Sequence, residues 1–240
     1  MRAGHSFFAG LPSPPRCELC ATPFKGPIAV VLGLLGKRPF PKNPRYCSFC
    51  VNGVLSKKVG AEVEMSALFA DVRGSTLMAE QLGPTKLHEA IDRFYRTGVE
   101  TLVKGGAILD RFMGDQVVGY FVPGFAGPEY ARRAIETGLA ILRATGHVGG
   151  APWIPIGAGV HKGSAFIGTV GGTEGLYELT AIGEDVNIAA RLAATAGPGE
   201  LLCTEVAYGA AGLHLPGDIR HLTLKGVTGQ VTTRVLHASS

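Results

Sequence analysis

Two aspartates and a short glycine-containing turn have the residue types that metal-assisted phosphoryl transfer requires. Asp71 ends a short apolar run, and Asp115 lies in a Gly-Asp turn between two later apolar runs. If these runs are neighbouring strands, both carboxylates reach one sheet edge and suit Mg²⁺, which keeps water and substrate phosphates as its other ligands. Gly74-Ser75-Thr76 then opens a helix whose N-terminal N–H groups can hold a polyphosphate. Either aspartate alone is better explained as a turn or capping residue, but together these features indicate phosphoryl transfer.

Four cysteines form a second group with a metal-ligand pattern. They lie in two Cys-x-x-Cys pairs, Cys17/Cys20 and Cys47/Cys50, separated by 26 residues. In a reducing compartment such pairs indicate a metal site before disulfides, and four thiolates complete a closed tetrahedral shell for Zn²⁺. We therefore expect one structural Zn²⁺ per chain; the alternatives are an iron–sulfur cluster, a redox dithiol and no metal. Cys203 is isolated and is expected to be a small buried hydrophobic residue.

Charge and proline content divide the chain near Gly60. Residues 1–60 carry nine cationic side chains and one carboxylate, a net charge of +8 in a chain of formal charge +4. We expect a basic, zinc-binding module over residues 1–60 and a second domain over residues 61–240. The basic module has the charge to meet an acidic partner, an anionic membrane surface or nucleic acid, although a solvated arm is the simpler explanation. Our preferred hypothesis for this module is a rigid staple or a dimer contact.

The composition excludes several classes of protein. With 46% hydrophobic and 18% charged residues the chain can build a packed core, and its 35 glycines follow no collagen period. The longest apolar run, residues 28–36, has nine residues, whereas a membrane span needs about 20. The first residues lack the apolar core of a secretory signal. The expected compartment is therefore the cytoplasm.

The apolar periodicity of residues 61–240 predicts an α+β domain with a ferredoxin-like, split βαβ order of elements. Its sheet is expected to be mostly antiparallel, with helices on one face. A hairpin between residues 154–160 and 165–170 is expected to turn at Lys162-Gly163. The other predicted strands cover residues 65–71, 107–113, 116–122, 219–224 and 231–236 with a short one near 201, and the predicted helices cover residues 86–102, 128–144 and 184–196.

Four motifs, in order along residues 61–240, resemble those of the class III nucleotidyl cyclases. Residues 67–76 (ALFADVRGST) and 110–121 (DRFMGDQVVGYF) are similar to that family's two metal motifs, residues 179–192 (LTAIGEDVNIAARL) to its transition-state motif, and residues 224–226 (LKG) to its lysine motif. Each motif alone is weak, but the set separates the chain from palm polymerases and diguanylate cyclases, which lack the Asn/Arg helix. The resemblance implies the class III cyclase fold and conversion of a nucleoside triphosphate into a 3′,5′-cyclic nucleotide and pyrophosphate.

The resemblance also implies roles for individual residues. Asp71, Asp115 and the backbone carbonyl of Val72 would bind two Mg²⁺ or Mn²⁺ ions per active site. The turn at residues 74–76 would contact phosphate, and Lys225 would bind the β- and γ-phosphates as a point charge.

In this family the active site spans a dimer interface. One subunit gives the metal-binding acids, and the other gives the purine-reading pair, Asn187, Arg191 and the lysine. Asn187 would orient the ribose, and Arg191 would stabilise the charge that develops on the α-phosphate. Because this chain carries both sets, a symmetric homodimer is expected to complete two identical sites.

Arg111 and Thr180 occupy the two positions that read the purine in the family. Thr180 can accept a hydrogen bond from the adenine N6 amino group. Arg111 only donates, which suits N1 of adenine and not the N1–H of guanine. The sequence therefore predicts that ATP is preferred. Arg111 replaces the usual lysine of adenylyl cyclases, and this exchange is not conservative.

Two other functions compete with an adenylate cyclase. The first is a guanylate cyclase, which Arg111 and Thr180 make less favourable. The second is a catalytically silent nucleotide sensor, or a nucleic-acid-binding zinc protein, with a cyclase-like dimerisation domain. The presence of both metal-binding acids and of the Asn/Arg helix argues against a silent protein.

Overall fold

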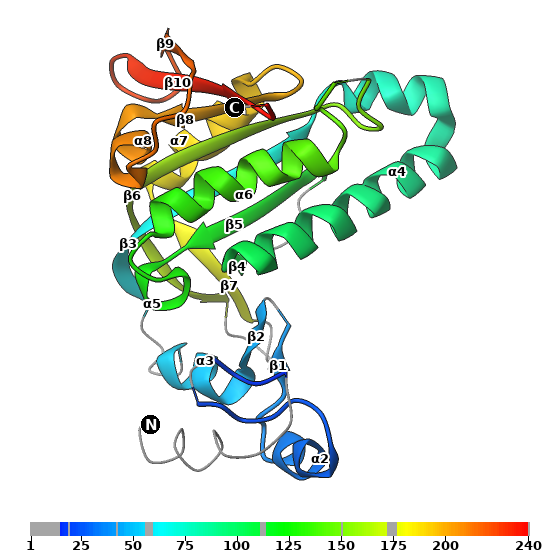
Figure 1. The fold of residues 1–240 in the computed structure, drawn as a ribbon, viewed down its shortest axis with the longest axis vertical. Helices are drawn as coiled ribbons and strands as arrows, with labels where there is room; N and C mark the ends of the chain where they lie inside the picture. Colours follow the sequence, from blue (N-terminus) through cyan, green and yellow to red (C-terminus); the bar gives the residue numbers. More distant parts are fainter. Residues whose placement is uncertain are drawn as a thin grey trace. The chain divides into compact units, whose positions relative to one another are not determined.

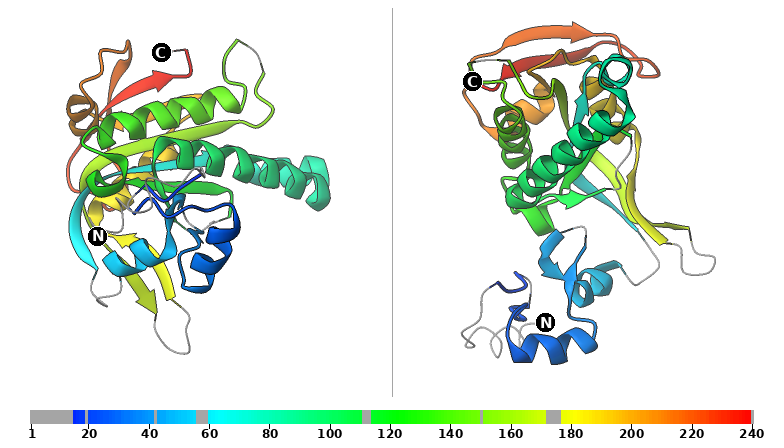
Figure 2. Two further views of the ribbon diagram at one scale, coloured as in Figure 1. Left: turned by 60° about the horizontal axis from the view of Figure 1, so that its bottom comes forward. Right: turned by 90° about the vertical axis from the view of Figure 1, so that its right-hand side faces the viewer.

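The structure is a computed structural model that describes residues 15–18, 20–41, 43–55, 60–110, 114–149, 151–171 and 177–239. It separates into two compact units (Figures 1 and 2). Residues 1–61 group with residues 168–179, and residues 62–167 group with residues 180–240. The boundary after residue 61 lies close to the predicted boundary near Gly60. The composition of residues 168–179 did not indicate that they group with the first unit.

Within its described residues up to Leu55, the first unit contains a two-stranded ladder and two short helices. β1 (Pro39–Phe40) pairs antiparallel with β2 (Asn43–Cys47), and α3 (Ser48–Leu55) follows β2 directly. α2 (Pro27–Leu34) has its proline in the first turn, where a missing N–H breaks no helical hydrogen bond. The chain leaves this helix through Gly36, whose φ of +80° favours glycine.

An eight-stranded sheet with the order β4-β5-β3-β6-β8-β10-β9, and with β7 paired to β6 off this path, makes up most of the second unit. Residues 168–171 of β6 and residues 177–179 of β7 belong to the first unit. The pairs β3–β5, β4–β5, β8–β10 and β9–β10 are antiparallel, and the pair β6–β8 is parallel. The sheet is therefore mostly antiparallel, as predicted. Its strands are β3 (Ala61–Val72), β4 (Ile108–Leu109), β5 (Gln116–Phe121), β6 (Ile156–Gly171), β7 (Tyr177–Ile182), β8 (Glu200–Thr204), β9 (Asp218–Leu222) and β10 (Val231–His237).

Helices cover both faces of this sheet, so the expectation of one covered face is wrong. α4 (Ser75–Gly105), α6 (Tyr130–Ala144) and α8 (Glu205–Ala211) pack on one face, and the short α5 (Pro123–Ala126) precedes α6 (Figure 1). α7 (Glu184–Thr195) packs on the other face. Neighbouring residues of β8 show this arrangement, because Leu201 belongs to the first core and Leu202 to the core beneath α7.

The predicted hairpin across Lys162-Gly163 is also wrong, because β6 continues through these residues. Gly163 serves close packing instead of a turn: a Cβ atom on this residue would lie 2.1 Å from the carboxylate of Asp185 on α7. The Ser164 N–H donates to the same carboxylate at 2.7 Å. In a sequence, a glycine that permits close approach cannot be distinguished from a turn glycine, and only the packing of α7 separates the two.

The remaining predicted elements are present with different ends. α4 begins at Ser75, where the turn at residues 74–76 predicted the start of a helix, and it bends at Gly83, whose φ of +73° is not helical and which precedes Pro84. Of the strand predicted at residues 107–113 the structure shows β4, and residues 111–113 lie outside the described part of the chain. Within the described residues, no helix combines the length and the apolar character that a membrane span needs.

Candidate active site

The ends of β3 and β5 bring the two predicted metal-binding aspartates close together. In the antiparallel register Asp71 pairs with Gln116, which places Asp115 in the turn opposite Val72. The Val72 N–H donates to the Asp115 carbonyl at 3.2 Å. The prediction that the first strand and the Gly-Asp hairpin are neighbours is thus confirmed, and the roles of the two acids stay predictions.

Asp71 is buried, and its two carboxylate oxygens have different surroundings. Oδ2 accepts a charged hydrogen bond from the guanidinium of Arg73, which also donates to the Ala194 carbonyl at 2.8 Å. No described residue hydrogen-bonds to Oδ1, although this atom is buried. A buried carboxylate oxygen without a partner is costly unless a cation binds it. Oδ1 and the neighbouring Asp115 therefore fit the oxygen ligands that a divalent metal ion takes.

Arg73 and Tyr95 hold this edge of the sheet in place, and neither was singled out by sequence reasoning. Tyr95 of α4 donates its hydroxyl to the carbonyl of Gly114, in the turn that carries Asp115. Burial, and then the Asp115 carboxylate, raise the pKa of Tyr95, so this residue stays a neutral donor at physiological pH. Burial lowers the pKa of Arg73, and Asp115 opposes that shift. Through Tyr95, α4 holds the turn that carries Asp115 beside the end of β3, where Arg73 holds Asp71.

The predicted phosphate-binding turn leads directly from this cluster into α4. Gly74 has a φ of +69°, and Ser75 and Thr76 form the start of the helix. Its N-cap residue is this glycine, which has no side chain to cap the helix. The first backbone N–H groups of a helix have no partner within it, so those of α4 can bind an anion.

α7 carries the predicted Asn187 and Arg191 one helical turn apart. Asn187 is exposed and Arg191 is half-buried. The buried face of α7 packs with Leu224, which fixes the start of the turn that contains Lys225. A Cβ atom on Gly226 would lie 3.8 Å from Nη2 of Arg191. The structure thus brings Arg191 next to the Lys225-Gly226 segment, 34 positions later in the sequence.

A buried histidine supports the start of α7. His161 of β6 contacts Oδ1 of Asp185 at 2.9 Å and Oγ1 of Thr204 at 2.9 Å. Thr204 in turn caps α8 by accepting the Ala207 N–H at 3.3 Å. In the sequence a lone histidine in a predicted strand indicates only a core or surface role. The contact of His161 with Asp185, two residues before Asn187, makes His161 a positioning group for the helix that carries the Asn/Arg pair.

Thr180, one of the two predicted purine contacts, lies beside the start of the second metal motif. Its hydroxyl donates to Oδ2 of Asp110 at 3.1 Å, and the Tyr120 hydroxyl donates to the same oxygen at 2.5 Å. Asp110 directly precedes Arg111, the other predicted purine contact, which lies outside the described residues. The structure therefore brings Thr180 to the segment that leads into Arg111.

The predicted site residues form two sets within one chain. The first is the pair Asp71 and Asp115, and the second is Asn187, Arg191 and Lys225. Within the described residues, no hydrogen bond or ion pair joins the two sets. The first set meets α7 through Arg73 at the Ala194 carbonyl, and Asn187 lies seven residues before that point, or about 10 Å along the helix.

Comparison with known proteins identifies the family of this chain. The family model "Adenylate and Guanylate cyclase catalytic domain" matches residues 58–223. The chain belongs to this family. The cyclase match includes both aspartates, Thr180, Asn187 and Arg191, and it ends two residues before Lys225.

The relatives support the fold, but they include both adenylyl and guanylyl cyclases and so do not decide between ATP and GTP as the substrate. The chain is 28% identical over 153 residues to an adenylate cyclase of Anabaena cylindrica, covering 58% of this chain and 29% of that protein. Two solved structures, the guanylyl cyclase Cya2 and the adenylyl cyclase CyaB from P. aeruginosa, each have a TM-score of 0.66 and 24% identity, over 74% and 73% of this chain and 93% and 95% of theirs. The cyclase fold is thus confirmed. The chain spans less than a third of the length of these curated relatives.

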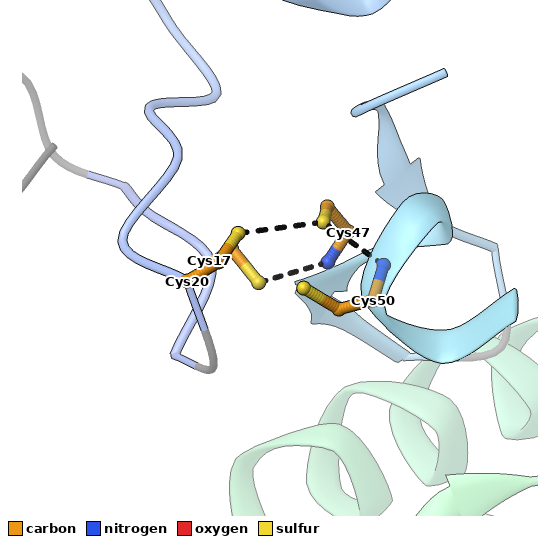
Figure 3. A group of neighbouring side chains, drawn as sticks. All are labelled: Cys17, Cys20, Cys47 and Cys50. Carbon is orange, nitrogen blue, oxygen red and sulfur yellow. Dashed lines mark hydrogen bonds between the residues drawn. The ribbon is translucent and has the colours of Figure 1, made fainter. Parts of the chain in front are cut away.

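The four predicted metal-binding cysteines lie before the cyclase match and form one cluster (Figure 3). Cys17 and Cys20 come from one loop, Cys47 ends β2 and Cys50 lies in α3. All four are buried, and their sulfur atoms lie within 4.8 Å of one another. The Sγ atoms of Cys20 and Cys47 are 3.7 Å apart, and the Cys47 N–H donates to Sγ of Cys17 at 3.2 Å. The cluster has the geometry to hold a metal ion.

Neighbouring thiols and burial disfavour negative charge in this cluster. The hydrogen bond between Cys47 and Cys17 raises the pKa of the Cys47 thiol most, and burial raises it further. Burial, and then Cys20, raise the pKa of Cys50 to about 12. The fifth cysteine, Cys203, is separately buried in the cyclase core, as predicted. Only a cation at the centre of the cluster would stabilise four thiolates together.

Proposed function

We propose that this chain is an adenylate cyclase that converts ATP into 3′,5′-cyclic AMP and pyrophosphate for intracellular signalling. Membership of the cyclase family supports the reaction class. One observation carries the assignment of the active site: Oδ1 of Asp71 is buried, no described residue bonds to it, and it lies at the same sheet edge as Asp115. A purely structural carboxylate rarely leaves a buried oxygen without a partner.

The metal-binding part of the site consists of Asp71, Asp115 and the backbone carbonyl of Val72, which would hold two Mg²⁺ or Mn²⁺ ions. Such ions, when bound, lower the pKa of the ribose 3′-OH and neutralise phosphate charge. Arg73 binds Oδ2 of Asp71 and so fixes the orientation of the carboxylate. The N-terminus of α4, at residues 74–76, holds phosphate oxygens through its backbone N–H groups.

The second set of residues acts on the ribose and the phosphates. Asn187 orients the ribose so that its 3′-OH attacks the α-phosphorus in line and pyrophosphate leaves. Arg191 stabilises the negative charge that develops on the α-phosphate. Lys225 binds the β- and γ-phosphates.

A homodimer would complete this site. Among the described residues, neither Asp71 nor Asp115 has a hydrogen bond or ion pair with Asn187 or Arg191. Asn187 lies about 10 Å along α7 from Ala194, whose carbonyl accepts a hydrogen bond from Arg73. A second copy of the chain, related by a two-fold axis, would supply the missing set to each pair of acids. This supports a homodimer with two shared active sites.

The chain is expected to prefer ATP to GTP, because Thr180 and Arg111 complement the edge of adenine. We expect kcat/KM for ATP to exceed that for GTP by about tenfold or more. Thr180→Val should lower kcat/KM for ATP about tenfold, whereas Thr180→Ser, which keeps the hydroxyl, should retain it. Chromatographic measurement of cyclic AMP and cyclic GMP, with Mg²⁺ and with Mn²⁺, tests this expectation.

The same assay separates the competing functions. Equal or faster turnover of GTP would contradict the purine assignment and favour a guanylate cyclase. Nucleotide binding without any cyclic product would favour a catalytically silent sensor. If Thr180→Val lowers turnover of ATP and GTP by the same factor while Thr180→Ser stays active, the hydroxyl supports the fold through Asp110 instead of reading the base.

We also propose that the four cysteines hold one structural Zn²⁺ per chain. The four sulfur atoms already lie within 4.8 Å of one another, and they come from two Cys-x-x-Cys pairs that are far apart in sequence. Zn²⁺ takes four thiolates in a closed tetrahedron and needs no open coordination position. The metal would join the 17–20 loop to β2 and α3, in a unit too small to be stable through burial alone.

The purified chain is expected to contain one zinc per chain by elemental analysis. Cys50→Ser should lose most of this zinc, and a chelator should lower the melting temperature of the first unit. Cys203→Ala is the matched control, because it removes a buried thiol outside the cluster and should keep the zinc. Iron with visible absorption would instead indicate an iron–sulfur cluster. Equal zinc in the wild type and in Cys50→Ser would contradict the site.

A further inference from the structure

The first unit exposes an apolar surface on α2, which we call the α2 surface. Every residue of Pro27–Leu34 is apolar or glycine, and none of them is buried. The exposed fraction reaches 77% for Leu34 and 69% for Val30. A helix that is apolar on all sides is normally buried in a core or in lipid. The large exposed side chains of this surface are Ile28, Val30, Val31, Leu34, Leu35 and Phe49.

Phe49 extends the α2 surface onto α3. The Ser48 N–H donates to the Arg38 carbonyl at 2.7 Å, which brings the start of α3 to the segment that follows α2. The Lys37 ammonium lies 5.3 Å from the centroid of the Phe49 ring. Phe49 itself is 58% exposed. The exposed apolar area is therefore shared by two elements of the first unit.

Cations lie at both ends of the α2 surface. Lys25 precedes the helix, and Lys37 and Arg38 follow it. Arg38 donates through Nε to the Gly33 carbonyl at 3.0 Å, which holds this cation at the end of the helix. The one carboxylate among residues 1–60, Glu18, forms an ion pair with Arg45. The apolar side chains are thus bordered by positive charge.

We propose that the α2 surface docks on an anionic lipid membrane. The helix is too short to span a bilayer, but its apolar side chains have the size and exposure to enter the boundary between headgroups and acyl chains. Lys25, Lys37 and Arg38 would then meet anionic headgroups. This places the first unit at the membrane surface and does not depend on the proposed cyclase activity.

Charge favours a membrane over a second copy of the chain as the occupant. In a symmetric α2–α2 contact the cations of one copy would approach those of the other, and like charges at a contact oppose association. An anionic bilayer instead attracts every one of these cations, by an amount that falls as salt is added. The excess of cations in residues 1–60, nine against one carboxylate, acts in the same direction.

Vesicle flotation of the 240-residue chain tests the proposal. We expect binding to vesicles that contain about one-third phosphatidylserine in phosphatidylcholine, and little binding to phosphatidylcholine alone. Val31→Ser with Leu34→Ser should weaken binding about tenfold or more, because both side chains lose their transfer into the apolar phase. Lys25→Gln and Lys37→Gln should each weaken it about fivefold. Val206→Ser is the control, because Val206 is 62% exposed on α8, in the other unit.

Three results would overturn the proposal. The first is the absence of binding to either vesicle by a chain that circular dichroism and a cooperative melting transition show to be folded. The second is binding that responds to the lysine variants but not to the Val31/Leu34 variant, which would make the contact purely electrostatic. The third is a dimer in solution that the Val31/Leu34 variant alone dissociates, without vesicle binding, because the surface would then be a contact between copies.

Discussion

Asp71→Asn is expected to reduce the formation of cyclic nucleotide about a thousandfold or more, because it removes a metal-binding charge without changing the shape of the side chain. Asparagine keeps one carbonyl oxygen, but it cannot supply the negative charge that a divalent ion needs from the Asp71 and Asp115 carboxylates. Asp115→Asn should have a similar effect. The measurement is kcat with ATP and saturating Mn²⁺.

The control for these variants must separate catalysis from folding. Asp71→Asn also breaks the ion pair with Arg73, so some loss of stability is expected. Asp92→Asn removes an aspartate from an exposed i,i+4 pair with Arg96 on α4 and should leave both activity and stability nearly unchanged. If Asp71→Asn and Asp115→Asn keep their melting temperatures and most of their activity, the acids at this sheet edge are not the metal ligands.

The sequence was informative about the acids because short-range rules position them. An apolar run followed by an acid predicts the end of β3, and Gly114-Asp115 between two apolar runs predicts a hairpin turn. Strand pairing then determines the rest: Asp71 pairs with Gln116. The cysteine pairs follow the same logic, since each turn supplies two sulfur atoms and the metal geometry requires all four to converge.

The groups that support the site were not predictable, because each depends on a contact between distant segments. Arg73 reaches the Ala194 carbonyl, 121 residues later, and His161 reaches Asp185 and Thr204. A lone arginine or histidine has no pattern that reports such a partner. The placement of α7 on the second face of the sheet also depends on contacts between distant segments. Leu201 and Leu202 of β8 are both apolar, and only the packing of α7 shows that they belong to two different cores.

The apolar run at residues 28–36 shows another limit of sequence reasoning. Hydropathy excludes a membrane span by length alone, yet it does not distinguish a buried segment from an exposed one. In the structure α2 has no buried residue, although every side chain on it is apolar. An apolar run that predicts a buried core segment thus forms an exposed surface. The cations beside it indicate a binding surface only once this exposure is known.

Mixed dimers of Asp71→Asn and Arg191→Ala chains are expected to regain about a quarter of the wild-type activity, although each variant alone is inactive. In a heterodimer one site receives both defects and the other receives neither, so one of its two sites is intact. With random exchange, half of the dimers are heterodimers, which gives the quarter. Heterodimers purified through two different tags should show about half of the wild-type activity, because one of their two sites is intact.

A second pair of variants makes the result decisive. Asp71→Asn mixed with Asp115→Asn places both defects in the same set of residues, so every site of the heterodimer contains one of them and no activity should return. Recovery in the first mixture and not in the second would require that Arg191 of one chain acts on the acids of its partner. Equal inactivity of the two purified heterodimers would mean that each chain builds its own site, and the two separate sets seen in one chain would then have to close on each other when nucleotide binds.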